Sequence, residues 1–335
     1  MTSSPTDIAG KAVRETDSTV LLTPRYEGTN ICTWIGFKHV NYLVEEAVLA
    51  HFRSAGVSAR DLYEEYGVGL DLVELDTRVL TALHADDPAR VTVRPVDGDG
   101  GGALRFRVGI EVEQRDGATI RAASSKVAVR LRRADDATDA PPVPGGLAGH
   151  VADSLGAGEP VDVAVPPPGG TRLADGRGGT DDPVLAPLLA DRNAFGWKWR
   201  IPYFYCHFSE RLQLSGYLRQ LEEVVDLFLA DRGISIRDML TDRQWIPVVP
   251  HSAIRILGEA LMEEDLYTVY TVDEVFKDFT YRSTMDCYVL RDGALRRMAT
   301  GTITHGYARI RNRRDWSLVD FDDRVHRALA GPGSR

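Results

Sequence analysis

Two stretches of similar pattern decide the fold. They read FKHVNYLVEEAVLAHF at residues 37–52 and LSGYLRQLEEVVDLFL at residues 214–229. In the second stretch the apolar residues recur every three or four positions, which is the spacing of one face of an α-helix. The first is apolar around more of its circumference, as a buried helix would be. Gly56 and Gly233 follow them at positions that suit helix C-termini.

The two stretches begin 177 positions apart, and other short matches recur at nearly the same spacing in the same order. They are GVSARDL (56–62) over GISIRDM (233–239), Glu45-Glu46 over Glu222-Glu223, Arg78-Val79-Leu80 over Arg255-Ile256-Leu257, Asp86-Asp87 over Glu263-Glu264, and RDGA (115–118) over RDGA (291–294). A repeat of this period predicts that the chain is an internal duplication.

Runs rich in strand-forming residues follow each helix. They cover residues 68–83, 89–96, 103–115 and 119–132 in the first copy, and 245–261, 266–276, 279–290 and 297–310 in the second. The Arg-Asp-Gly segments at 115–117 and 291–293 predict hairpin turns, because Asp-Gly favours type I′ geometry. Each copy is therefore predicted to be an α+β unit: one strand, a long helix, a short helical turn and an antiparallel meander.

A segment rich in proline and glycine separates the copies. Residues 134–195 hold no aromatic side chain before Phe195, so they bury too little surface to offset the entropy of ordering. We expect a linker there, with a short helical turn near 184–189. The predicted boundaries are a disordered N-terminus (1–18), a first unit (19–133), the linker (134–195), a second unit (196–311) and a C-terminal tail (312–335).

Composition excludes several classes of protein. The chain has 335 residues and a net charge of −9, which argues against a general nucleic-acid binder. No apolar run is as long as a membrane span, and the N-terminus has no apolar signal region, so we expect a cytoplasmic protein. Cys32, Cys206 and Cys287 form no Cys-x-x-Cys pair, which predicts reduced core thiols rather than disulfides or a metal site.

Sequence details resemble a known superfamily. Tyr26-Glu27-Gly28-Thr29-Asn30, Asn41-Tyr42-Leu43 and Glu45-Glu46-Ala47 are similar to the first hotdog of acyl-acyl-carrier-protein thioesterases. Gly216-Tyr217-Leu218-Arg219 with Leu221-Glu222-Glu223 resembles the start of the helix in single-hotdog thioesterases of the 4-hydroxybenzoyl-CoA type. The resemblance implies a tandem (double) hotdog that hydrolyses an acyl or polyketide thioester on coenzyme A or acyl carrier protein. It implies no cofactor, and a monomeric pseudo-dimer or a homodimer.

The chain departs from the usual motifs of these enzymes. Many carry Asp-x-Asp or Asp-x-Asn, then Gly-His, before the helix; here only Thr29-Asn30 is kept in the first copy. The second copy has Ser209-Glu210-Arg211, and the Asn-x-His of plant-type enzymes is not recognisable. Two other functions therefore stay open. One is a dehydratase, hydratase or cyclase acting on a carrier-bound chain, and the other is a non-catalytic acyl-binding module.

Thioester hydrolysis needs a base for water, hydrogen-bond donors for the carbonyl oxygen, and an apolar slot. Glu45 and Glu222 are candidate bases, because helical spacing puts Glu222 at the rim of an apolar face and Glu223 in solvent. The alternative is that both are surface charges or partners of Arg78 and Arg255.

Other polar residues near the predicted helix starts are weaker candidates. Asn30 could position water or satisfy a turn, and His39 could be a base or a helix-surface residue. His207 shares a strand face with Ser209, but no third group completes a triad. Cys32 is a nucleophile only if it is not a buried thiol.

Two further groups recur near the ends of the units. Arg130, Arg132 and Arg133 end the first unit, and Arg309, Arg311, Arg313 and Arg314 end the second. Arg130, Arg132, Arg311 and Arg313 could hold a phosphopantetheine phosphate or an acidic carrier protein, or be solvated. Aromatic residues cluster between Phe195 and Phe208, as core or as pocket lining.

Overall fold

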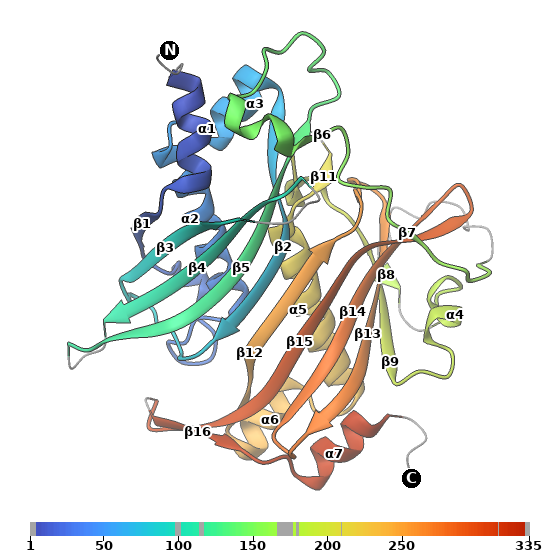
Figure 1. Ribbon diagram of the computed structural model, residues 1–335. Coiled ribbons are helices and arrows are strands. Elements are labelled where there is room, and N and C mark those ends of the chain that lie inside the picture. Colours follow the sequence, from blue (N-terminus) through green and yellow to red (C-terminus); the bar gives the residue numbers. More distant parts are fainter. Residues whose placement is uncertain are drawn as a thin grey trace. The chain divides into compact units, whose positions relative to one another are not determined.

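The computed structural model describes residues 5–97, 102–113, 117–165, 177–178, 181–208, 210–313 and 315–331. The chain divides into two compact units, Met1–Leu155 and Gly156–Arg335. Figure 1 follows the chain through the elements of both. Among the residues described, none of the helices is both long and apolar enough to cross a membrane.

Unit 1 is built on helix α2 (Phe37–Ser54), which is followed by the short helix α3 (Ala59–Tyr66). Its antiparallel sheet has the strand order β1-β3-β4-β5-β2. The strands are β1 (Ser18–Leu22), β2 (Val68–Val79), β3 (Ala89–Val96), β4 (Leu104–Glu113) and β5 (Thr119–Arg133). Every second residue of β4 is buried, which gives the sheet one apolar face, and α2 packs against β1 to β4.

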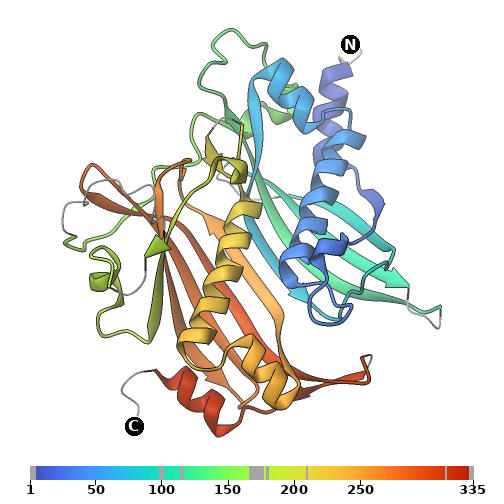
Figure 2. The same cartoon turned by 180° about the vertical axis from the view of Figure 1, so that it is seen from behind.

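Unit 2 repeats this plan around helix α5 (Leu214–Asp231) and the short helix α6 (Ile236–Arg243). Its strands run in the order β12-β15-β14-β13-β9, again antiparallel. They are β9 (Ala194–Arg200), β12 (Trp245–Ile256), β13 (Asp265–Phe276), β14 (Thr280–Arg291) and β15 (Ala294–Arg311). Figure 2 shows α2 and α5, each lying along the sheet of its own unit.

The predicted duplication is visible in the backbone. Helices α2 and α5, helices α3 and α6, and strands β2 and β12 begin 177 positions apart. Ser58 and Ser235 cap α3 and α6 in the same way, with the side chain accepting a hydrogen bond from a backbone N–H of the first turn. Gly56 and Gly233 have φ of 85° and 70°, as expected just beyond a helix C-terminus.

The segment expected as a linker contributes short elements to both units. In unit 1 it forms the turn η2 (Gly145–His150) and β6 (Val151–Ala152), which pairs with β5. In unit 2 it supplies β7 (Glu159–Pro160), which pairs with β15, and α4 (Leu185–Leu189).

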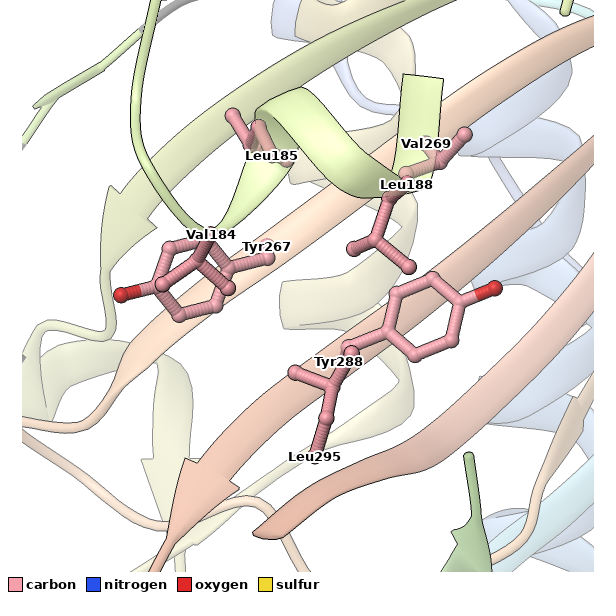
Figure 3. Close-up of a cluster of buried hydrophobic side chains, with 7 residues drawn as sticks. All are labelled: Val184, Leu185, Leu188, Tyr267, Val269, Tyr288 and Leu295. Carbon is pink, nitrogen blue, oxygen red and sulfur yellow. The ribbon is translucent and has the colours of Figure 1, made fainter. Parts of the chain in front are cut away.

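A second hydrophobic cluster explains why part of this segment is ordered. Val184 and α4 cover the face of the sheet opposite α5, as Figure 3 shows. The cluster comprises Val184, Leu185, Leu188, Tyr267, Val269, Tyr288 and Leu295. Because neighbouring strand residues point to opposite faces, Tyr267 and Val269 need this cover while Thr268 and Tyr270 face α5. The prediction of a linker rested on the overall proline and glycine content, which does not reveal these few apolar positions.

The expected disordered termini also carry structure. Residues Pro5–Glu15 form helix α1, and the C-terminal segment forms β16 (Asp315–Val319) and helix α7 (Asp323–Ala330). Val325 and Leu329 are buried, which ties α7 to unit 2. The second Asp-Gly turn is confirmed, since Asp292 and Gly293 both have positive φ between β14 and β15. In the first, residues 115 and 116 lie outside the described residues.

Candidate active site

The loop before α2 brings polar groups to the start of the central helix in unit 1. The turn η1 (Tyr26–Gly28) is fixed by a hydrogen bond from the Gly36 N–H to the Gly28 carbonyl, at 3.0 Å. Gly36 caps the helix without a side-chain hydrogen bond. Residues after Gly28 fold back on themselves, with the Asn30 N–H donating to the Trp34 carbonyl at 2.6 Å.

His39 lies in the first turn of α2 and is buried, with 7% of its surface exposed. Its Nε2 is 3.3 Å from Oε1 of Glu27 in the loop. A Cβ built on Gly28 would come within 2.6 Å of the imidazole, so the ring packs directly against this glycine. Tyr42 meets the ring edge-on, with centroids 5.1 Å apart. The prediction of a helix-surface histidine is therefore wrong, because a glycine in the loop makes room for the ring.

The Glu27 contact defines the chemistry of this imidazole. A hydrogen bond from Nε2 to the carboxylate places the proton on Nε2 and leaves the lone pair on Nδ1. A carboxylate that holds a histidine in one orientation and stabilises its charged form is the arrangement found in general bases. The backbone N–H groups at the start of α2 give this end of the helix a partial positive charge, which favours a nearby negative charge.

In unit 2 the glycine lies on the helix rather than in the loop. Its matched loop residue is Tyr205, and its matched helix residue is Gly216. A Cβ on Gly216 would lie 2.6 Å from Leu212 Cδ1 and 3.0 Å from the Cβ and the carbonyl oxygen of Tyr205, so here the glycine lies on the helix and makes room for the loop. The Tyr205 ring packs on Trp199 at 5.4 Å, with the Arg219 guanidinium 5.5 Å above it. The helix start of unit 2 therefore has no imidazole at this position.

The two predicted bases occupy equivalent places on their helices. Glu45 and Glu222 are half-buried, whereas the following residues, Glu46 and Glu223, are exposed. This is the rim position that the helical spacing predicted. The catalytic role of either carboxylate stays a prediction.

Asn30 and His207 also occupy matched positions. Asn30 is exposed, and its Oδ1 accepts a hydrogen bond from the Ile31 N–H at 3.0 Å, which is the turn role foreseen as the alternative. His207 lies in β10 (Cys206–His207), which pairs with β11 (Arg211–Leu212). Its ring packs on Phe208 at 4.6 Å. Ser209, the predicted neighbour of His207, lies outside the described residues.

The arginines at the two strand ends have different surroundings. Arg132 is buried, and its Nη1 is 2.7 Å from Asp135 Oδ1; Arg130 is half-buried. Arg311, the last residue of β15, and Arg313, in the turn before β16, are exposed, and Arg314 lies outside the described residues. Phosphate or carrier binding by these four arginines stays a prediction, with only the unit 2 pair exposed.

The cysteines differ from the expectation at one position. Cys32 is exposed rather than buried, in a left-handed conformation with φ of 66°. Burial raises the pKa of Cys206 to about 11 and that of Cys287 to about 12, so both are thiols at neutral pH. Nor is the aromatic cluster uniformly core, since Tyr203 and Phe204 are 72% and 61% exposed. No group of three or more possible metal ligands occurs among the residues described.

The residue that sequence reasoning left without a role is Glu27. It belongs to the quoted Tyr-Glu-Gly-Thr-Asn segment, but its partner His39 lies 12 positions away, across an irregular loop. Neither the helical nor the strand period joins two such positions. In the sequence, Gly28 was the clearest indication that a ring packs here, because a glycine near the start of a helix permits the close approach of a ring.

Comparisons with solved structures show the fold. An acyl-ACP thioesterase from Bacteroides thetaiotaomicron aligns with a TM-score of 0.51 and 11% identity, covering 86% of this chain and 97% of that one. The 12:0-ACP thioesterase from Umbellularia californica aligns with a TM-score of 0.52 and 11% identity, covering 90% of this chain and 98% of that one. No protein-family model and no curated protein matches the sequence. The chain has the tandem hotdog fold that the sequence predicted.

Proposed function

We propose that this protein hydrolyses acyl thioesters carried on coenzyme A or acyl carrier protein, with His39 as general base. The observation that carries the proposal is the buried imidazole at the start of α2, hydrogen-bonded to Glu27. The fold supports it, because the two solved structures named above are acyl-ACP thioesterases. Three features of unit 1 would therefore act together: an oriented base, helix N-terminal N–H groups and an apolar interior.

The proposed reaction is direct attack of water on the thioester. Nδ1 of His39 takes a proton as the water oxygen bonds to the carbonyl carbon. The carbonyl oxygen becomes an oxyanion, which the N–H groups at the start of α2 stabilise. The carbon–sulfur bond then breaks, and the imidazolium returns its proton to the leaving thiolate. The products are a carboxylic acid and a thiol, while Glu27 keeps the ring oriented throughout.

Glu45 and Glu222 are the alternative bases. Their half-buried positions on α2 and α5 are compatible with such a role. Replacing each with glutamine keeps the shape and removes the base. If Glu45→Gln or Glu222→Gln abolishes thiol release while His39→Ala does not, the base is that carboxylate and His39 is not.

The test is thiol release from a panel of acyl-CoA and acyl-carrier-protein thioesters, with the products identified by mass. We expect a free thiol and a carboxylic acid, and a loss of about 10²- to 10⁴-fold in kcat/KM for His39→Ala. A matched control is His326→Ala, which removes a partly exposed histidine 3.7 Å from Asp278 and is expected to keep wild-type activity.

Two outcomes would contradict hydrolysis. A product that differs by one water with the thioester intact would make the protein a dehydratase or hydratase. Absence of any turnover across the panel, together with an acyl thioester that raises the melting temperature, would make it a binding module.

Recognition of the carrier can be tested separately. Arg311 and Arg313 are exposed and an acyl carrier protein is acidic, so the double change Arg311→Ala/Arg313→Ala should raise KM for acyl carrier protein thioesters only. An equal rise for acyl-CoA would instead support binding of the phosphopantetheine phosphate that both substrates share, and no change would remove these arginines from the site.

A further inference from the structure

The interior of unit 2 contains polar atoms that the protein itself does not satisfy. They are Tyr270 OH, Ser283 Oγ, His305 Nδ1 and Tyr307 OH, and each belongs to a residue no more than 2% exposed. Among the residues described, none of the four atoms forms a hydrogen bond of normal geometry, although the Tyr270 hydroxyl interacts with those of Ser283 and Tyr281. Burying a polar atom without a partner costs free energy, so native proteins rarely leave several together.

These atoms lie on one face of the sheet, beneath α5. The Tyr270 ring packs on Phe228 of α5, with centroids 4.6 Å apart, and its hydroxyl lies beside those of Ser283 and Tyr281. His305 is paired with Tyr281 in the β14–β15 ladder, and the two rings stack at 5.2 Å. Tyr307 follows two positions along β15 on the same face. The four atoms therefore form one group rather than isolated defects.

A second set continues this group toward the start of α5. Gln220 donates from Nε2 to Thr268 Oγ1 at 2.6 Å, and Thr268 is 3.6 Å from the Cys287 sulfur. Within the described chain, Gln220 Oε1 and the fully buried Tyr217 OH have no hydrogen-bond partner. Since Thr268 and Tyr270 alternate along β13, the two sets form one polar stripe between helix and sheet.

The matched positions of unit 1 are apolar. The strand register and the helix offset pair Tyr270 with Val93, Ser283 with Phe106, His305 with Val129, and Tyr307 with Leu131. On the helix, Tyr217 and Gln220 replace Val40 and Leu43. All of these unit 1 residues are buried core. The fold therefore does not require a polar interior, which makes the stripe a property of unit 2 alone.

The chemistry of the stripe specifies what it can bind. It consists of hydroxyls, an amide, an imidazole and a thiol, and contains no Asp, Glu, Lys or Arg. Burial lowers the pKa of His305 to about 3, so its imidazole is neutral at physiological pH. Hydroxyls both donate and accept, whereas neutral Nδ1 and the amide oxygen offer lone pairs. Such a set matches uncharged oxygen groups along a chain and offers no cation to a carboxylate or a phosphate.

We propose that the interior of unit 2 binds an acyl chain bearing hydroxyl or keto groups, with the polar stripe as its hydrogen-bonding partner. This inference goes beyond the proposed function, because it gives the interior of unit 2 a ligand of its own, apart from the thioester that unit 1 is proposed to hydrolyse. An unsubstituted fatty chain would leave the stripe unpaired, and a site built to pair with a hydroxyl discriminates against analogues that lack one.

The test compares dodecanoic acid with dodecanoic acids that carry one hydroxyl or keto group at carbon 3, 5, 7, 9 or 11. Binding of the free acids is measured by calorimetry and does not depend on catalysis. We expect at least one oxygenated acid to bind about tenfold more tightly than dodecanoic acid. Ser283→Ala and Tyr307→Phe should reduce that preference to about twofold or less.

Tyr288→Phe is the matched control, because Tyr288 lies on β14 but on the opposite face of the sheet, in the cluster of Figure 3. It should keep the preference. Equal binding of all acids, or a preference that survives the stripe variants, overturns the proposal, as does a crystal structure in which water alone pairs with the stripe in the presence of the oxygenated acids. If thiol release fails but the preference is found, the proposed function falls and the binding site remains.

Discussion

The two units share one backbone plan but differ in which side chains they place inside it. In unit 1 the space between helix and sheet is filled by residues such as Val93, Phe106 and Leu131. In unit 2 the matched positions hold Tyr270, Ser283 and Tyr307. The pattern of buried and exposed positions is enough to specify the fold in both cases. The identity of the buried residues is therefore free to differ, and with it what each interior can hold.

The helix starts differ in a complementary way. Unit 1 places His39 on the helix and Gly28 in the loop, while unit 2 places Gly216 on the helix and Tyr205 in the loop. In both units a glycine lets loop and helix approach closely, but only unit 1 places an imidazole there, which can transfer a proton near neutral pH. We propose that unit 1 carries the acid–base chemistry and that unit 2 recognises polar groups of a ligand.

The largest effect on the free energy of unfolding is expected for a substitution in the apolar interior of unit 1. Phe106→Ala empties a buried position where the ring meets Phe52 at 6.0 Å and His51 at 5.2 Å. It should cost about 3–5 kcal/mol of unfolding free energy, measured by urea denaturation. If it costs no more than Ser283→Ala, the matched change in unit 2, the contrast between an apolar and a polar interior is wrong.

A smaller loss is expected where loop and helix meet. Gly28→Ala would push a methyl group into the His39 ring and should cost about 1–3 kcal/mol, with a fall in thiol release as the ring moves. The control is Gly149→Ala, whose added methyl meets nothing within 4 Å. Full activity in Gly28→Ala would show that the position of the ring is unimportant.

The polar interior also predicts a dependence of stability on pH. Burial lowers the pKa of His305 from 6.5 to about 3. Between these pH values the unfolded chain binds a proton that the folded chain does not bind. The free energy of unfolding is therefore highest above pH 6.5 and falls as the pH drops below that value, with a loss of about 2 kcal/mol at pH 5. His305→Phe, which keeps an aromatic ring beside Tyr281, should flatten this profile.

Comparing the two profiles is necessary because burial also lowers the pKa of His51 and of His150 in unit 1, and both contribute to the slope with the same sign. Their contributions are common to wild type and His305→Phe, so the difference between the curves isolates unit 2. Identical curves would mean that His305 accepts a proton in the folded protein.

The smallest expected effect is that of Ser283→Ala on the protein without ligand. Removing a buried hydroxyl that forms no hydrogen bond of normal geometry among the described residues should change the free energy of unfolding by less than about 1 kcal/mol, in either direction. A loss well above that value in urea denaturation would indicate that the hydroxyl is already paired, which would weaken the case for a ligand there.

The repeat and the fold were readable from sequence because they depend on periodic patterns. The helix at 214–229, the offset of 177 and the second Asp-Gly turn all follow from spacing or local backbone preference. The ordered structure around Val184 was not predicted, because only a few apolar residues there pack on a sheet face that is distant in sequence. The average composition of the segment does not show such a contact.

The candidate site was only partly readable for a related reason. Glu222 lies at the rim of its helix, as predicted, because helical spacing sets its face. The pairing of His39 with Glu27 crosses a loop, and the polar stripe in unit 2 joins three strands and a helix. Such contacts depend on tertiary register, which one sequence does not display.

We propose that acid–base chemistry belongs to His39 at the helix start of unit 1 and not to its counterpart Tyr205 in unit 2. The most direct measurement is the single-turnover rate of thiol release in His39→Ala and in Tyr205→Phe. We predict a fall of about 100-fold or more for His39→Ala and a change within about twofold for Tyr205→Phe. Wild-type release by His39→Ala, or an equal loss in both variants, would contradict the claim.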